Sequence, residues 1–222
     1  LARIDPSVRA RLQRLKLMVF DVDGVLTDGG LWYTEHGETL KRFHALDGHG
    51  LKMLTVSGIQ VALVTGRESP IIARRAAELG LGAVMQNVRD KGAVLTELLT
   101  RFGVALEQTG FMGDDLIDLP AMQRAGFSAS VPDAPAYITQ AAHWVSERRG
   151  GHGAARECCD LILAAQQRLG VFFQPGLLGT GPVQAVVVHK KEYCGKTTQK
   201  ILSITVFVKR FDIFFLVSYT KQ

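Results

Sequence analysis

Cysteine is scarce in this sequence, and its placement argues against a disulfide framework or a thiolate metal site. The 222 residues include three cysteines, at positions 158, 159 and 194. The count is odd, two cysteines are adjacent, and no Cys-x-x-Cys spacing occurs. This cysteine usage fits a reducing compartment, so we expect a cytoplasmic protein.

Long uninterrupted apolar runs are also lacking. The best candidate for a membrane span, residues 201–219, carries Lys209, Arg210 and Asp212 near its middle, where charge is most costly. The first 14 residues contain four arginines and no apolar stretch of the kind found in secretory signals. The sequence therefore predicts neither a membrane span nor a secretory signal.

Most of the chain carries no excess of positive charge. Residues 171–222 hold seven of the 26 basic and two of the 21 acidic residues, which accounts for the whole net charge of +5. We therefore expect a neutral domain at 1–170 and an atypical basic tail at 171–222, with possible short strands but no assignable role. The basic tail has no helical face or known binding motif, so we expect no nucleic-acid or membrane partner.

Short apolar runs alternate with helical patterns over residues 1–170. This alternation predicts an α/β fold with a doubly wound, Rossmann-like, mostly parallel sheet. Glycines at 58, 80, 103 and 126 stand where helices should end. A β-hairpin insertion after the first strand is indicated by two short runs, 31–33 and 39–43, around a Gly-containing turn. The expected strands are 17–20, 61–64, 83–85, 110–112 and 127–129, and the expected helices are 48–57, 69–79, 91–102 and 116–124.

Polar motifs follow the expected strands. Asp21-Val22-Asp23-Gly24 follows the first strand, Thr65-Gly66-Arg67 the second, and Gly113-Asp114-Asp115-Leu116-Ile117-Asp118 a later one, while Lys91 begins a helix. Ligands of open α/β sheets bind outside the carboxyl ends of the strands, so these motifs should surround one crevice. Carboxylates suit Mg²⁺, and a carboxylate can attack phosphorus once a cation and an ammonium group offset the repulsion.

In this order, DVDGVLTDG, VTGR, the lysine and GDDLID resemble the four motifs of the haloacid dehalogenase superfamily of phosphohydrolases. The resemblance implies that Asp21 is the nucleophile, and that Asp23 protonates the leaving oxygen and then activates water. It further implies that Thr65 binds the phosphoryl oxygens and that Lys91 neutralises their charge. The metal ligands would be Asp21, the backbone carbonyl of Asp23, and Asp114.

The segments between the motifs make the resemblance more specific, from the superfamily to one family within it. About 36 residues separate Thr27 from Val64, which is too few for a cap domain. The segments GGLWYTEHGETLKRFHALDGHGLKML and RGGHGAARECCDLIL are similar to 3-deoxy-D-manno-octulosonate 8-phosphate phosphatases, over about residues 10–170. That family implies a capless homotetramer with centrally associated hairpins, a phosphorylated sugar acid as substrate, and a product used in lipopolysaccharide biosynthesis.

Several further residues carry weaker expectations. Arg67 could contact a substrate phosphate or carboxylate, and Asp118 is expected to orient other groups rather than bind metal. Lys41, Asp47 and Gly48 match the hairpin-to-helix region of the related phosphatases, with a solvated strand residue as the alternative for Lys41. His44 is interpreted as a hairpin surface residue. His152 stands where the related phosphatases commonly have Arg, which could alter substrate affinity.

Two alternatives remain open at this stage. A phosphatase of a nine-carbon sugar acid phosphate, or a promiscuous sugar phosphatase, would share every catalytic residue. A non-catalytic oligomerisation module of the same fold is a different class, because fold alone does not determine function. The intact set of Asp21, Asp23, Lys91 and Asp114 favours an enzyme.

Overall fold

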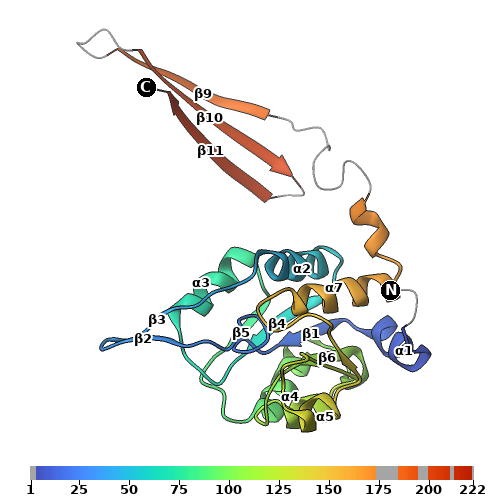
Figure 1. Ribbon diagram of the computed structural model, residues 1–222. Coiled ribbons are helices and arrows are strands. Elements are labelled where there is room, and N and C mark those ends of the chain that lie inside the picture. Colours follow the sequence, from blue (N-terminus) through green and yellow to red (C-terminus); the bar gives the residue numbers. More distant parts are fainter. Residues whose placement is uncertain (1–3, 174–184, 195–199, 211–212, 222) are drawn as a thin grey trace. The chain divides into compact units, whose positions relative to one another are not determined.

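The computed structural model describes residues 4–173, 185–194, 200–210 and 213–221 (Figure 1). The chain divides into two compact units, Leu1–Gly170 and Val171–Gln222. Among the described residues, no helix has both the length and the apolar character needed to cross a membrane.

A six-stranded parallel sheet forms the centre of the first unit. Its strand order is β5-β4-β1-β6-β7-β8, which confirms the predicted doubly wound sheet. In the central strand, Phe20 lies opposite Leu63 of β4 and Met112 of β6, so β1 and β6 end level and β4 runs one residue further. The strands are β1 (Leu17–Phe20), β4 (Gln60–Val64), β5 (Ala83–Met85), β6 (Thr109–Met112), β7 (Phe127–Ser130) and β8 (Trp144–Val145).

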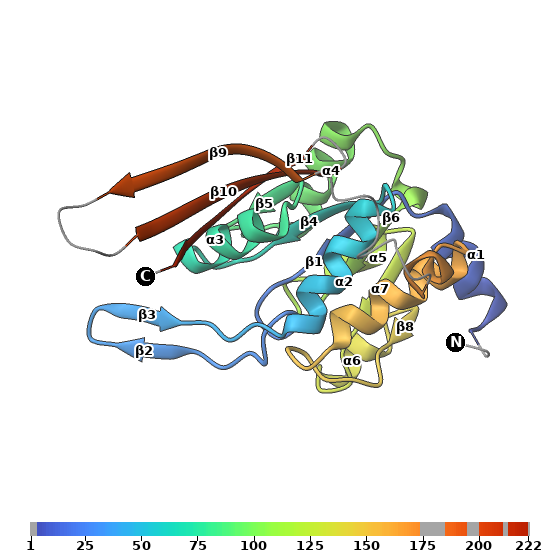
Figure 2. The ribbon, with the colours of Figure 1, turned by 90° about the horizontal axis from the view of Figure 1, so that it is seen from above.

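Helices cover both faces of this sheet. One face carries α2 (Ala45–Val56), α3 (Pro70–Leu79) and α7 (Ala154–Ala165), and the other carries α4 (Lys91–Phe102) and α5 (Leu119–Arg124) (Figures 1 and 2). All four residues of β1 are buried, which explains the continuous apolar run. Leu17 and Val19 pack in one core cluster with Leu95 and Leu98 of α4. Shorter elements are α1 (Pro6–Arg14), α6 (Ala136–Thr139), η1 (Leu106–Gln108) and η2 (Leu169–Phe173).

The predicted hairpin insertion is confirmed, with shifted boundaries. Strands β2 (Trp32–Thr34) and β3 (Gly37–Leu40) pair antiparallel and project from the unit (Figure 2). The returning strand was expected at 39–43. It begins earlier because the turn consists of Glu35 and His36, and Gly37, with a φ of 106°, already pairs with Thr34; the strand ends before Lys41.

Some boundaries and elements differ from expectation. The helix predicted at 116–124 begins only at Leu119, because Asp118 N–H bonds the Asp115 carbonyl oxygen in a preceding turn. The helices α1, α6 and α7, the strand β8 and the short helices η1 and η2 were not predicted from the sequence. Gly80 and Gly103 end α3 and α4 in the left-handed conformation, as predicted.

Gly126 does not end a helix. Helix α5 stops at Arg124, and Gly126 instead lies against η1, with its N–H donated to the carbonyl oxygen of Leu106. A Cβ atom at position 126 would lie 2.6 Å from the carbonyl oxygen of Glu107. Glycine is needed at this position for a close backbone approach, so the predicted capping role was wrong.

The second unit contains an antiparallel sheet of three strands in the order β11-β10-β9. Its strands are β9 (Ala185–Cys194), β10 (Lys200–Arg210) and β11 (Ile213–Lys221). Consecutive strands pair with each other, which is the simplest connectivity for an antiparallel sheet.

Replacing Gly126 by alanine should destabilise the protein, because the new methyl group has only backbone to push against. We expect the free energy of unfolding in urea to fall by about 1–3 kcal/mol, the usual cost of overpacking. Gly170→Ala is the matched control, since nothing lies within 4 Å of its added Cβ. Equal stability of the two variants would contradict this interpretation of Gly126.

Candidate active site

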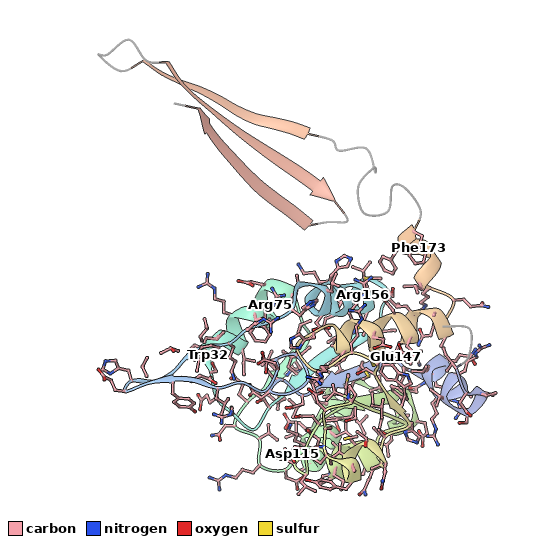
Figure 3. All side chains as sticks on the ribbon, viewed as in Figure 1. Trp32, Arg75, Asp115, Glu147, Arg156 and Phe173 are labelled. Atoms are coloured by element: carbon pink, nitrogen blue, oxygen red, sulfur yellow. The ribbon has the colours of Figure 1, made fainter. Side chains whose placement is uncertain are left out.

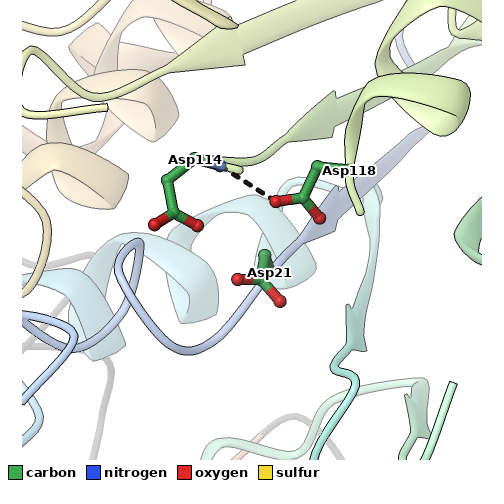
Figure 4. A group of neighbouring side chains, drawn as sticks. All are labelled: Asp21, Asp114 and Asp118. Atoms are coloured by element: carbon green, nitrogen blue, oxygen red, sulfur yellow. Dashed lines mark hydrogen bonds between the residues drawn. The ribbon is translucent and has the colours of Figure 1, made fainter. Parts of the chain in front are cut away.

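Three acidic side chains meet at the carboxyl edge of the sheet. Asp21 directly follows β1, while Asp114 and Asp118 lie in the turn between β6 and α5. Each side chain offers a carboxylate oxygen, and these oxygens lie within 4.8 Å of one another (Figure 4). The convergence follows from the level ends of the neighbouring strands β1 and β6.

The side chain of Lys91 holds this acidic group together. Its Nζ lies 2.6 Å from Asp21 Oδ1 and 2.5 Å from Asp118 Oδ1, and the lysine residue is 1% exposed. Burial alone lowers the pKa of Lys91, but the charges of Asp21 and Asp118 outweigh it and raise the pKa above its ordinary value. Lys91 is therefore a permanently charged ammonium group aimed at Asp21.

Asp118 uses both of its carboxylate oxygens to orient other groups of the site. Its Oδ1 accepts from Lys91, while its Oδ2 accepts from the backbone N–H groups of Asp114 and Asp115, at 3.0 and 3.2 Å. Both oxygens of this fully buried carboxylate are thus engaged. This bonding is what an orienting residue requires, and it accounts for an acid four residues after Asp114.

The carboxylates carry more negative charge than one lysine neutralises. Burial raises the pKa of Asp21 well above its ordinary value, and the charge of Asp118 adds to the effect while Lys91 opposes it. Burial, followed by the charge of Asp118, raises the pKa of Asp114 to about 7. Such shifts mark a place where a further cation would be stabilised.

Two motif glycines make room for these carboxylates. A Cβ atom on Gly24 would lie 1.9 Å from the Oδ2 atom of Asp114. A Cβ atom on Gly113 would lie 2.4 Å from the Cβ atom of Asp118. The glycines in Asp-x-Asp-Gly and Gly-Asp-Asp are therefore required by the packing of the site itself.

The hairpin supplies an unexpected partner for Asp23. Lys41 follows β3, and its Nζ lies 2.5 Å from Asp23 Oδ1 and 2.8 Å from Glu38 Oε1. Its side chain is only 1% exposed, so the interpretation of Lys41 as a solvated residue was wrong. His44 is not on the hairpin either; it directly precedes α2, and its buried Nδ1 has no hydrogen-bond partner among the described residues.

Thr65 and Arg67 occupy the end of the adjacent strand β4. Thr65 is buried, and its hydroxyl oxygen accepts from the Arg67 N–H at 3.2 Å. The Arg67 guanidinium donates to the Tyr33 hydroxyl of the hairpin at 2.9 Å. That bond places the guanidinium on the hairpin side of the site, and together with the charges of Asp23 and Glu38 it raises the pKa of Arg67.

A glycine-rich segment before α7 packs against the loop after β1. A Cβ atom on Gly150 would lie 1.8 Å from the Gly24 carbonyl oxygen, and one on Gly151 would lie 2.4 Å from the Asp28 nitrogen. Asp47 of α2 fastens the segment by accepting from the N–H of Gly153 at 3.2 Å. Burial raises the pKa of Asp47, and the hydrogen bonds from the Arg156 and Gly153 N–H groups oppose the shift.

His152 belongs to the same glycine-rich segment and contacts Gly150 and Arg42. Its Nδ1 lies 2.8 Å from the Gly150 carbonyl oxygen, and its Nε2 lies 3.3 Å from an Arg42 Nη1 that also contacts Asp28. The sequence indicates no partner for His152 or Asp47, because both interactions join segments more than 100 residues apart.

The sequence is similar to characterised and solved phosphatases. A model of the haloacid dehalogenase-like hydrolase family matches residues 78–157. The 3-deoxy-D-manno-octulosonate 8-phosphate phosphatase of Haemophilus influenzae is 45% identical over 165 residues, which cover 74% of this chain and 92% of that protein. The enzyme of the same name from Escherichia coli K12 is 39% identical and covers 75% of this chain and 88% of its own.

Solved structures that resemble this chain are also phosphatases. The cobalt-bound H. influenzae phosphatase has a TM-score of 0.72 and 45% identity, covering 74% of this chain and 96% of its own. The Moraxella catarrhalis enzyme, solved with a magnesium ion, a phosphate ion and a KDO molecule, has a TM-score of 0.73 and 40% identity, covering 75% and 95%.

Asp118→Asn should weaken the fold around this site, because an amide has one acceptor oxygen where the carboxylate uses two. Either Lys91 or the N–H groups of the turn would then face an amide NH₂ group. We expect the free energy of unfolding to fall by about 1–3 kcal/mol, the cost of an unsatisfied buried group. Asp115→Asn, at an exposed side chain, should change it by less than about 0.5 kcal/mol. Urea unfolding followed by circular dichroism measures both, and an unchanged Asp118→Asn midpoint would refute the expectation.

Proposed function

The chain belongs to the 3-deoxy-D-manno-octulosonate 8-phosphate phosphatases, a family of haloacid dehalogenase-like hydrolases, and on this basis we propose that it hydrolyses 3-deoxy-D-manno-octulosonate 8-phosphate to KDO and phosphate. One observation carries the proposal: the Lys91 ammonium lies 2.6 Å from Asp21, in a buried cluster with Asp114 and Asp118. A carboxylate held beside a fixed positive charge is suited to attack an anionic phosphoryl group.

In the first proposed step, an Asp21 oxygen attacks phosphorus as the bond from phosphorus to the sugar oxygen breaks. Asp23, in its protonated form, gives its proton to the departing oxygen, so the sugar leaves as a neutral alcohol and Asp23 becomes a carboxylate. The product on the enzyme is an aspartyl-phosphate at Asp21. Lys91 stabilises the negative charge that approaches Asp21.

In the second step, the Asp23 carboxylate removes a proton from a water molecule that attacks the phosphorus of this intermediate. The bond between phosphorus and the Asp21 oxygen breaks, phosphate leaves, and Asp23 is again protonated. Asp21 returns to its carboxylate form, so the cycle balances. One residue thus serves as acid and then as base.

Substrate binding is assigned to the residues around the reacting carboxylates. We propose that Thr65 donates its hydroxyl to a phosphoryl oxygen and that Lys91 and Asp23 contact the phosphate ester. Arg67 is proposed to contact a charged group of the sugar acid, since its guanidinium faces the hairpin side and can form two parallel bonds to a carboxylate.

The donor set fits Mg²⁺. Asp21, Asp114 and Asp118 bring three carboxylates against one ammonium group, and burial, followed by the charge of Asp118, raises the pKa of Asp114 to about 7. Hard oxygen ligands that share an unneutralised charge are the ligands that Mg²⁺ prefers. Asp21, Asp114 and the backbone carbonyl of Asp23 would hold the ion, which when bound neutralises phosphoryl charge.

The homotetramer of the family is also part of the proposal. Leu31, Trp32, Tyr33 and Leu40 are 44–59% exposed on the projecting hairpin, where Trp32 is labelled in Figure 3. An exposed apolar two-stranded ribbon is marginally stable alone and is stabilised by packing against other copies. Free, buried Cys158 and Cys159 support a cytoplasmic location, because such compartments keep thiols reduced.

Asp21→Asn should abolish turnover, because the amide is no nucleophile toward phosphorus. We expect phosphate release from the octulosonate 8-phosphate to require Mg²⁺ and to fall by at least about 10⁴-fold in the variant. A panel including a nine-carbon sugar acid phosphate and a small aromatic ester identifies the substrate. Preference for the aromatic ester over all sugar acids would rule out the specific assignment, and an active Asp21→Asn variant would rule out the nucleophile.

We propose that residues 1–170 are the catalytic domain and that residues 171–222 are dispensable. A chain ending at Gly170 should retain or gain phosphatase activity and should form a tetramer by light scattering. Trp32→Glu in this shortened chain should lower the molar mass, because it charges the hairpin surface. A folded but inactive shortened chain would contradict the proposal, and so would a monomer in the absence of the Trp32 substitution.

A further inference from the structure

Lys41 is the second buried lysine of the site, and its surroundings differ from those of Lys91. Its ammonium contacts one oxygen of Asp23 at 2.5 Å and Glu38 at 2.8 Å. The side chain of Lys41 is 1% exposed, and that of Glu38 is 12% exposed. Burying a long charged side chain is costly unless it is paired, so this ion pair defines the position of both acids.

The contact leaves the two oxygens of Asp23 unequal. Oδ1 is occupied by Lys41, whereas Oδ2 is buried and has no hydrogen-bond partner among the described residues. A buried polar atom without a partner is rare and calls for a functional explanation. Oδ2 is therefore the atom of Asp23 that remains available to hold and transfer a proton.

We propose that Lys41 is a positioning residue that directs Oδ2 of Asp23 toward the leaving oxygen of the substrate. The inference rests on the proposed function, in which Asp23 is the acid of the first step. The proton that Oδ2 carries moves to the leaving oxygen as the bond from that oxygen to phosphorus breaks. Lys41 itself takes no part in bond making.

The hairpin therefore helps to position the residues of the site. Lys41 joins β3 to the loop after β1, and Tyr33 of β2 joins the same hairpin to Arg67 after β4. The hydrogen bond to Tyr33, and after it the charges of Asp23 and Glu38, raise the pKa of Arg67. A displaced hairpin would release Asp23, so the positioning of the acid depends on the placement of the hairpin.

A positioning role for the acid predicts a dependence on the leaving group. An alkyl phosphate such as glycerol phosphate needs a proton on its leaving oxygen, whereas p-nitrophenolate leaves as a stable anion. Neither ester carries a sugar acid carboxylate, so direct binding of that carboxylate by Lys41 would not affect the comparison.

The test compares Lys41→Met with the unchanged protein, at saturating Mg²⁺, on these two esters and on the octulosonate 8-phosphate. General acids contribute about 10²–10⁴-fold, so we expect kcat/KM, which reports the first step and not the hydrolysis of the intermediate, to fall at least about 100-fold for both alkyl esters and less than about tenfold for p-nitrophenyl phosphate. The ratio of the two rates is independent of the fraction of folded enzyme. Lys41→Arg should recover part of the alkyl activity.

Controls separate the possible outcomes. Lys52→Met, at an exposed lysine of α2, should leave the ratio unchanged. Asp23→Asn should show the same leaving-group dependence, and adding Lys41→Met to it should cause no further change in the ratio. Equal losses on all esters, or a raised KM for the sugar acid alone, would overturn the positioning role. Absence of activity in the unchanged protein would instead overturn the proposed function.

Discussion

The site depends on the burial of one ammonium group between two carboxylates. Lys91 begins α4, Asp21 directly follows β1, and Asp118 lies before α5, so the ion pairs connect three elements at one point. Removing one partner of a buried ion pair costs about 3–5 kcal/mol, because the other charge is left unpaired. The same arrangement keeps Asp21 beside a positive charge, so stability and the proposed chemistry place the same demand on these residues.

Around this centre, segments far apart in the chain are joined by backbone contacts that only glycine allows. Gly150 lies against the carbonyl of Gly24, and Gly24 in turn makes room for Asp114. Asp47 attaches the glycine-rich segment to α2 across more than 100 residues. The hairpin contacts the loop after β1 through Lys41. Each contact brings a different part of the chain to the loop after β1, which explains why that loop is so rich in glycine and aspartate.

The parallel sheet could be predicted, because buried apolar runs, helical periods and the Gly80 and Gly103 caps are local signals. The family resemblance is confirmed, and the meeting of Asp21 with Asp114 follows from the strand order. Lys41, Asp47 and His152 could not be placed, because their partners are remote in sequence and a lysine or histidine in a polar segment is usually solvated. Gly126 shows the same limit: a cap and a close backbone approach both require glycine, and only the packing distinguishes them.

The central claim is that phosphate passes through a covalent bond to one carboxylate. Acid quenching during turnover of radiolabelled 8-phosphate substrate, followed by peptide mapping, tests it directly. The account predicts label on the peptide containing Asp21, sensitive to mild base and absent from Asp21→Asn. Rapid turnover with no protein-bound label, or label on a peptide without Asp21, would contradict it.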